Sequence, residues 1–173
     1  MISKKMVKAL NKQLNFELYS AYVYLAMAAN SNTMGLKGFS NWFHIQFQEE
    51  LFHADRFYNY ILDQDGEVEL EQIEKPKKEY KDAYELFDET LTHEREVTKR
   101  IYDLASLALE EKDHGTHSWL QWFITEQQEE EANVKDIKDK LKLAGSTGQG
   151  LFMINAELAT RVYVQPTVPG SQA

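Results

Sequence analysis

The sequence contains no cysteine among its 173 residues. This absence excludes a disulfide framework, a zinc site built on thiolates and a cysteine-ligated iron–sulfur centre. It fits a reducing compartment, and we expect a cytoplasmic protein. No apolar run is long enough to span a bilayer, and the first residues carry no signal peptide with an apolar core. We therefore expect no association with membranes.

Basic residues are also scarce relative to acidic ones, with 19 Lys and Arg against 28 Asp and Glu and a net charge of −9. A nucleic-acid partner is not expected, because such a surface needs a basic patch. Only three prolines and eight glycines interrupt the chain, so long helices are possible. A chain that is 43% hydrophobic at this length suits one compact domain.

Apolar residues recur every three to four positions in four long segments, which is the pattern of amphipathic helices. Each segment is near 28 residues, or about 40 Å long. The predicted helices cover about Ser3–Asn30, Leu36–Asp63, Asp82–Glu111 and His117–Leu143, with a short fifth over Leu151–Arg161.

The segment between the second and third helices lacks helical periodicity and contains Gly66 and Pro76. We interpret it as an extended loop that runs the length of the bundle and joins two helices pointing the same way. The predicted fold is all-α: a four-helix bundle with one long crossover and a short fifth helix. Residues 1–160 form this domain and residues 161–173 form a loose tail. The fifth helix is apolar on most sides, which suggests burial against another copy of the chain.

Each of the four apolar stripes is interrupted near mid-helix by polar side chains. The interrupting residues are Glu17; Glu50 and His53; Glu94; and Gln127 and Glu130. In a bundle of this topology they lie at one level and point inward.

Burial of four carboxylates together is very unfavourable without compensation. Protonation of some of them could relieve it, and a single glutamate in such a stripe could simply reach solvent. Bound cations are a better compensation for the whole set, and oxygen ligands with an imidazole suit iron or manganese. Glu50 is the natural bridge between two metals, since His53 lies one turn along on the same face.

The residues around these positions resemble bacterial non-haem ferritins along nearly the whole chain. The matching motifs are NFELYSAYVYL around Glu17, FQEELFHAD around Glu50 and His53, HERE around Glu94, QWFITEQQEEE around Gln127 and Glu130, and the closing GLFMINAELATR. The resemblance implies a ferroxidase that oxidises Fe²⁺ with dioxygen or peroxide at two irons inside each subunit. It also implies storage of the ferric mineral in a homo-oligomeric shell of 24 subunits.

The resemblance further implies roles for individual residues. Glu17, Glu50 and His53 would bind the first iron, Glu50, Glu94 and Glu130 the second, with Gln127 hydrogen-bonded beside it. A third iron would lie close by on Glu49, Glu126, Glu129 and Glu130, although a solvated acidic helix face explains these residues too. Tyr24 would hydrogen-bond to the site and could donate an electron; a core tyrosine is the alternative. Asp113, His114 and His117 fall where the resemblance implies a pore between subunits, and a short polar turn explains them equally well.

Related families fit the sequence less well. A bacterioferritin would carry a haem-binding methionine where this chain has Leu51, and a Glu-x-x-His pair where it has Gln127 and Glu130. We therefore expect no haem. A rubrerythrin would need cysteines, and mini-ferritins lack the fifth helix. From another class, a purely structural or signalling bundle is disfavoured by the buried carboxylates.

Overall fold

Five α-helices build the protein, in a computed structural model that describes residues 2–145 and 148–168. They are α1 (Lys4–Thr33), α2 (Lys37–Asp63), α3 (Ala83–Glu110), α4 (His114–Ala144) and α5 (Gly148–Leu158). No strand occurs within the described residues, so the prediction of an all-α bundle is confirmed. None of these helices has both the length and the apolar character needed to cross a membrane.

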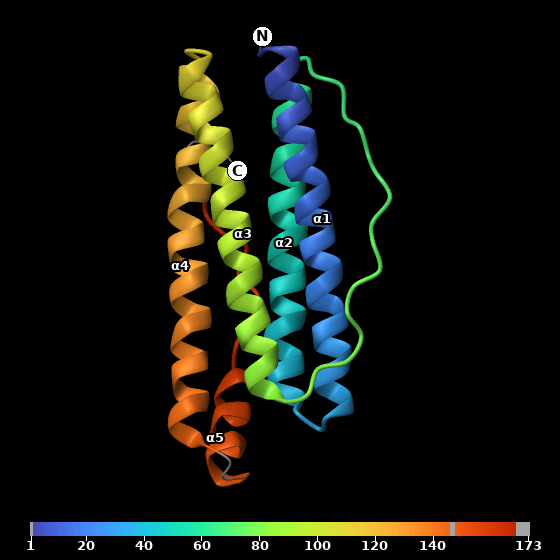
Figure 1. The fold of residues 1–173 in the computed structure, drawn as a ribbon, viewed down its shortest axis with the longest axis vertical. Coiled ribbons are helices and arrows are strands. Elements are labelled where there is room, and N and C mark those ends of the chain that lie inside the picture. The colour runs from blue at the N-terminus through green and yellow to red at the C-terminus, as the bar shows by residue number, and fades with distance from the viewer. Residues whose placement is uncertain (1, 146–147, 169–173) are drawn as a thin grey trace.

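The helices pair as two hairpins, α1 with α2 and α3 with α4 (Figure 1). The segment between α2 and α3 runs outside α1 from one end of the bundle to the other, so α2 and α3 point the same way, as predicted (Figure 1). Two asparagines of α1 hold the backbone of this crossover. Asn11 donates to the carbonyl of Glu67 at 2.8 Å and accepts from the amide of Glu69 at 2.7 Å. Asn15 binds the backbone of Glu69 and Glu71 in the same way, which keeps the segment extended without a strand partner.

Side-chain caps set the start of three helices. Ser3 accepts a hydrogen bond from the amide of Met6, and Asp82 from that of Glu85. Asp113 caps α4 by accepting from the amide of Thr116 at 3.0 Å. The predicted start of this helix at His117 is therefore wrong by about one turn. Gly115 lies in the first turn of α4, where a glycine costs little stability because its amide has no partner within the helix.

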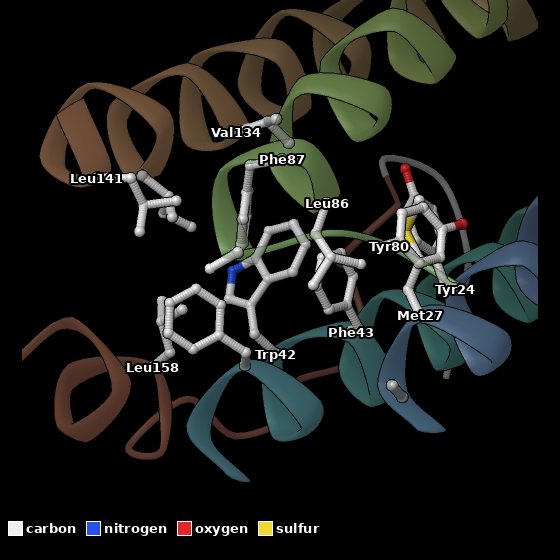
Figure 2. Packing of buried hydrophobic residues seen from close by; sticks show 14 of the residues in the cluster. Tyr24, Met27, Trp42, Phe43, Tyr80, Leu86, Phe87, Val134, Leu141 and Leu158 are labelled. Carbon is white, nitrogen blue, oxygen red and sulfur yellow. The ribbon is translucent and has the colours of Figure 1, made fainter. Parts of the chain in front are cut away.

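The core is divided into two apolar clusters by a polar layer. The first cluster, nearer α5, includes Tyr24, Phe43 and Phe87 and extends to Leu158 of α5 (Figure 2). The second cluster, at the far end, includes Leu14, Phe57, Ile101 and Phe123. On every long helix the gap between the two clusters coincides with the polar residues that interrupt the sequence pattern.

Helix α5 packs across the end of the bundle against α2 and α4 (Figure 1). It covers Gly148–Leu158, three residues earlier than predicted. Ile154 and Leu158 are buried, whereas Phe152 and Met153 remain 70% and 65% exposed. One side of α5 thus presents apolar side chains with nothing in the described chain to cover them.

The close approach of α5 to α2 depends on Gly38. A Cβ atom at this position would lie 1.7 Å from the backbone oxygen of Asn155, and the Gly38 amide donates to the Asn155 side chain at 2.8 Å. We expect Gly38→Ala to displace α5, exposing Ile154 and Leu158. Loss of this burial would cost up to roughly 3–6 kcal/mol. Hydrogen exchange of the α5 amides should accelerate accordingly.

The matched control is Gly115→Ala, at another glycine in the first turn of a long helix. A Cβ there would meet only the Asp113 carboxylate, at an ordinary 3.6 Å. Exchange in α5 should be unchanged in this variant. Protected α5 amides in Gly38→Ala would contradict the argument.

Candidate metal centre

The six polar residues that interrupt the apolar stripes all lie inside the bundle. Their exposed fractions are 1% for Glu17, 2% for Glu50, 1% for His53, 0% for Glu94, 2% for Gln127 and 4% for Glu130. Each long helix contributes at least one of them, because each stripe turns inward at the same level. The predicted convergence on the bundle interior is therefore present in the structure.

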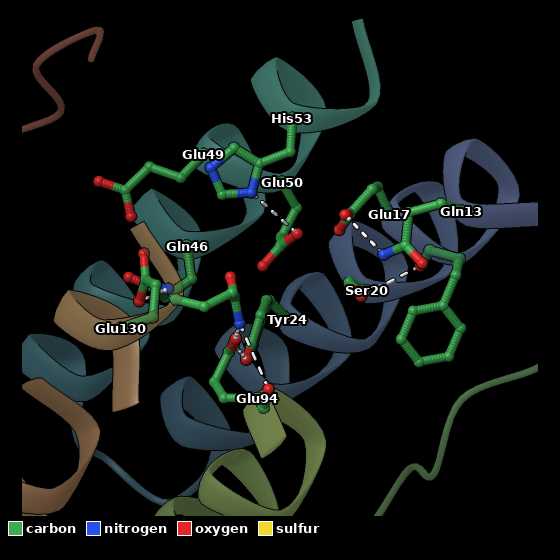
Figure 3. Close-up of polar contacts among 12 residues, drawn as sticks. Gln13, Glu17, Ser20, Tyr24, Gln46, Glu49, Glu50, His53, Glu94 and Glu130 are labelled. Carbon is green, nitrogen blue, oxygen red and sulfur yellow. Dashed lines mark hydrogen bonds and ion pairs between the residues drawn. The ribbon is translucent and has the colours of Figure 1, made fainter. Parts of the chain in front are cut away.

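Three of these side chains come closest together. Glu17, Glu50 and His53 each offer a ligand atom, and the three atoms lie within 4.8 Å of one another. In Figure 3, Glu50 extends from α2 toward Glu17 on α1, and the His53 ring lies 3.5 Å from the Glu50 carboxylate, measured from Nδ1 to Oε2. Across the described part of the chain, no other set of three or more histidines and carboxylates meets this spacing.

Three atoms of this trio that could bind a metal have no hydrogen-bond partner among the described residues. Glu17 Oε2, Glu50 Oε2 and His53 Nε2 are buried and make no hydrogen bond to the described protein. The other oxygen of Glu17, Oε1, accepts a hydrogen bond from the Gln13 amide at 2.8 Å. Buried polar groups without partners are uncommon, and two carboxylates with one imidazole form a donor set suited to iron, manganese or zinc.

Burial makes the charged forms of these carboxylates unfavourable. The pKa of Glu17 is raised well above its ordinary value, first by burial and then by the neighbouring Glu50. The pKa of Glu50 is raised in the same direction by burial and by Glu94. A metal cation would reverse this preference, because it stabilises the deprotonated carboxylates.

Glu94 lies in the same layer, with both of its oxygens engaged. The Tyr24 hydroxyl donates to Oε1, and the Gln127 amide donates to Oε2 at 3.0 Å. Burial, followed by the charge of Glu130, raises the pKa of Glu94 to about 8. Tyr24 and Gln127 therefore occupy the hydrogen-bonding positions that the family resemblance implies, while electron donation by Tyr24 stays a prediction.

The four residues expected at a third iron do not share one environment. Glu130 accepts from the Gln46 amide at 2.9 Å. Glu49 extends away from Glu50 (Figure 3) and binds Arg161. Glu126 is half-buried, which raises its pKa, and Glu129 is exposed. Binding of a metal by all four would require some of these side chains to move.

Two residues that the sequence analysis left out reach this layer. Gln46 is fully buried one turn before Glu50, whereas the neighbouring Phe47 is only half-buried. Arg161 arrives from beyond α5, in the segment expected to be loose. Gln46 could have been found from its spacing of four from Glu50, but no sequence pattern places Arg161.

Comparison with known proteins identifies the family of the chain. The family described as Ferritin-like domain matches residues 7–144. Bacterial non-heme ferritins of Staphylococcus aureus strain MRSA252 and Staphylococcus haemolyticus are each 39% identical over 163 residues, covering 94% of this chain and 98% of theirs. The open pore ferritin from Archaeoglobus fulgidus superposes with a TM-score of 0.93 at 45% identity, over 94% of this chain and 100% of that one. A humanized archaeal ferritin gives 0.94 at 44% identity, over 95% and 99%. The family match over residues 7–144 and the similarity to these relatives show that the chain belongs to the ferritin family.

Proposed function

We propose that the protein stores and detoxifies iron: it oxidises Fe²⁺ to Fe³⁺ at a site for two irons inside each bundle and deposits the product as mineral in a shell of 24 subunits. Membership of the ferritin family supports iron storage. The single observation that carries the oxidation site is the convergence of Glu17, Glu50 and His53, with three buried atoms that lack hydrogen bonds.

The proposed ligands follow the layer. Glu17, Glu50 and His53 hold the first iron, and Glu50, Glu94 and Glu130 hold the second. Glu50 is the proposed shared ligand because its carboxylate lies in one group with Glu17 and His53 and is also close enough to Glu94 for that carboxylate, after burial, to raise the pKa of Glu50. Gln127 fixes Glu94 from the far side. Glu49, Glu126 and Glu129, with Glu130, remain the proposed residues for a third iron.

Iron is the substrate, and the electrons balance over two ions. Each Fe²⁺ loses one electron, and dioxygen accepts two electrons and two protons to give hydrogen peroxide; peroxide as oxidant would give two water molecules. The carboxylates favour the ion of higher charge, which lowers the potential of the iron couple. Protons held by Glu17, Glu50 and Glu94 are released when Fe²⁺ binds, since ligands must be deprotonated.

Assembly into a shell is supported by two features. Helix α5 leaves Phe152 and Met153 exposed, and such apolar groups favour contact with further copies. The similar archaeal ferritin is described as an open pore ferritin and, after mutagenesis, as a closed form. A pore that can be open or closed suggests a hollow assembly. A cytoplasmic location stays a prediction.

Two measurements on the purified protein test the proposed function. Stopped-flow oxidation of Fe²⁺ in air should be much faster with the protein than in buffer alone. A crystal soaked anaerobically with ferrous salt should show two anomalous peaks, one between Glu17 and His53 and one beside Glu94. A structural or signalling bundle would leave both the oxidation rate and the anomalous map unchanged.

His53 supplies the only nitrogen ligand of the proposed site. We expect His53→Ala to weaken binding at the first position by about 100-fold, since even indirect partners of metal ligands contribute 10–100-fold. Calorimetric titration with Zn²⁺, which does not change oxidation state, measures the loss. The exposed His44 on the same helix provides the control, and His44→Ala should bind normally. Equal affinities of the two variants would contradict the assignment of His53.

A further inference from the structure

The chain beyond α5 is tied to the side of α2. The Asn41 amide donates to the carbonyl of Leu158 at 3.2 Å and to that of Arg161 at 2.9 Å. These two bonds fix the backbone where it leaves α5 and direct the Arg161 side chain along α2. Arg161 is thus held at both its backbone and its side chain.

The guanidinium group of Arg161 makes contacts on three sides. Its Nη2 donates to both carboxylate oxygens of Glu49, at 3.1 and 2.7 Å, and its Nη1 donates to Gln46 Oε1. The centre of the group lies 5.0 Å from the Trp42 ring. The side chains are only 26% and 14% exposed for Arg161 and Glu49. A charge-assisted pair in this partly buried setting is stronger than an ordinary surface ion pair.

Gln46 transmits this contact to the metal layer. Because its Oε1 accepts from Arg161, its amide nitrogen faces inward and donates to Glu130 Oε2 at 2.9 Å (Figure 3). Gln46 is completely buried, so neither end can turn to water instead. A continuous path of hydrogen bonds therefore runs from Arg161 through Gln46 to Glu130.

We propose that Arg161 acts as a built-in cation that occupies Glu49 and positions Glu130 through Gln46, so that a third metal ion binds only by displacing the guanidinium from Glu49. The proposal rests on the proposed function, because it takes Glu49 and Glu130 as ligands of that ion. A metal at Glu49 needs at least one of the two oxygens that Arg161 holds. A metal cation bound to Glu49 would also lie close to the positively charged guanidinium and be repelled by it.

Two consequences follow for metal binding. The third ion binds more weakly than the first two, although its carboxylates are present. Arg161 is a positioning residue in this account, and its influence is on the number and affinity of bound ions. A residue that merely anchored the chain after α5 would leave metal binding at Glu49 unchanged.

The test compares the assembled wild-type protein with Arg161→Leu and Arg161→Lys, titrated with Zn²⁺ by calorimetry. We expect Arg161→Leu to strengthen binding of a third ion by about tenfold or more, because it removes a charged hydrogen-bonded partner of Glu49. Arg161→Lys keeps the positive charge but not the planar guanidinium group. Its affinity for the third ion should therefore lie between those of the wild type and Arg161→Leu. Anomalous scattering from Zn²⁺-soaked crystals should place the added ion on Glu49, and Glu49→Gln combined with Arg161→Leu should abolish it.

The outcomes separate the two proposals. Two tightly bound ions in every protein, with no stronger third ion in Arg161→Leu, would overturn the role of Arg161 and leave the paired site standing. Absence of the two tight ions from wild type would overturn the proposed function and, with it, this inference.

Discussion

Replacing Glu50 with alanine is expected to slow the oxidation of Fe²⁺ by at least about 100-fold while the protein stays folded and assembled. The estimate takes the upper end of what partners of metal ligands contribute, because Glu50 is proposed to bind both irons directly. Its side chain is 2% exposed and lies between the Glu17 side and the Glu94 side of the layer. No other carboxylate in the described chain lies with both Glu17 and His53 inside the 4.8 Å group.

Folding should survive because Glu50 contributes little to stability without metal. Burial and the nearby carboxylates make its charged form unfavourable, as the raised pKa indicates. Glu50→Gln provides a second variant that keeps the side-chain volume, so a cavity cannot explain lost oxidation. Glu110→Ala, at an exposed position, is the control for removal of a carboxylate as such. Stopped-flow absorbance gives the rate and size-exclusion chromatography gives the assembly. Fast oxidation by both Glu50 variants would contradict its role as the shared ligand.

The centre of the bundle was predictable because helical periodicity reports which way each side chain points. Glu17, Glu94 and Glu130 break otherwise apolar stripes, and burial of a carboxylate is too costly to be accidental at the same level on four helices. The turn and crossover lengths then determine which helices lie side by side. Periodicity was less reliable at single positions: it did not identify Gln46 of α2, which is fully buried while the neighbouring Phe47 is only half-buried.

The contacts of Arg161 could not be predicted from the sequence, for a physical reason. Arg161 and Glu49 are separated by 112 positions in the sequence, and they meet only because α5 docks on α2. That docking depends on the missing side chain of Gly38 and on its hydrogen bond to Asn155, which are tertiary details. A local pattern records the face of a helix, but it holds no information about where a segment lies after a change of direction.

The raised pKa values of the buried carboxylates predict an unusual dependence of stability on pH. The metal-free protein should lose stability as the pH rises from about 4.5 to about 8. A glutamate in the unfolded chain titrates near 4.5, whereas Glu94 in the folded protein titrates at about 8, and the pKa values of Glu17 and Glu50 are raised too. Between these limits the folded state holds more protons than the unfolded state, so stability falls with rising pH. The loss should reach roughly several kcal/mol, since each pKa unit corresponds to about 1.4 kcal/mol.

Metal should reverse the sign of this dependence. Zn²⁺ binds the deprotonated carboxylates, so its stabilising effect grows as the pH rises and protons compete less. Thermal unfolding at fixed protein concentration, with chelator or with Zn²⁺, measures both slopes. Glu17→Gln should flatten the slope of the metal-free protein: its amide oxygen can still accept from Gln13, and its amide nitrogen would replace Glu17 Oε2, which lacks a partner. The exposed Glu79→Gln should leave the slope unchanged. A metal-free protein whose stability rises steadily from pH 5 to 8 would show that these carboxylates are charged without a cation, and the main physical reason for a metal in this layer would be removed.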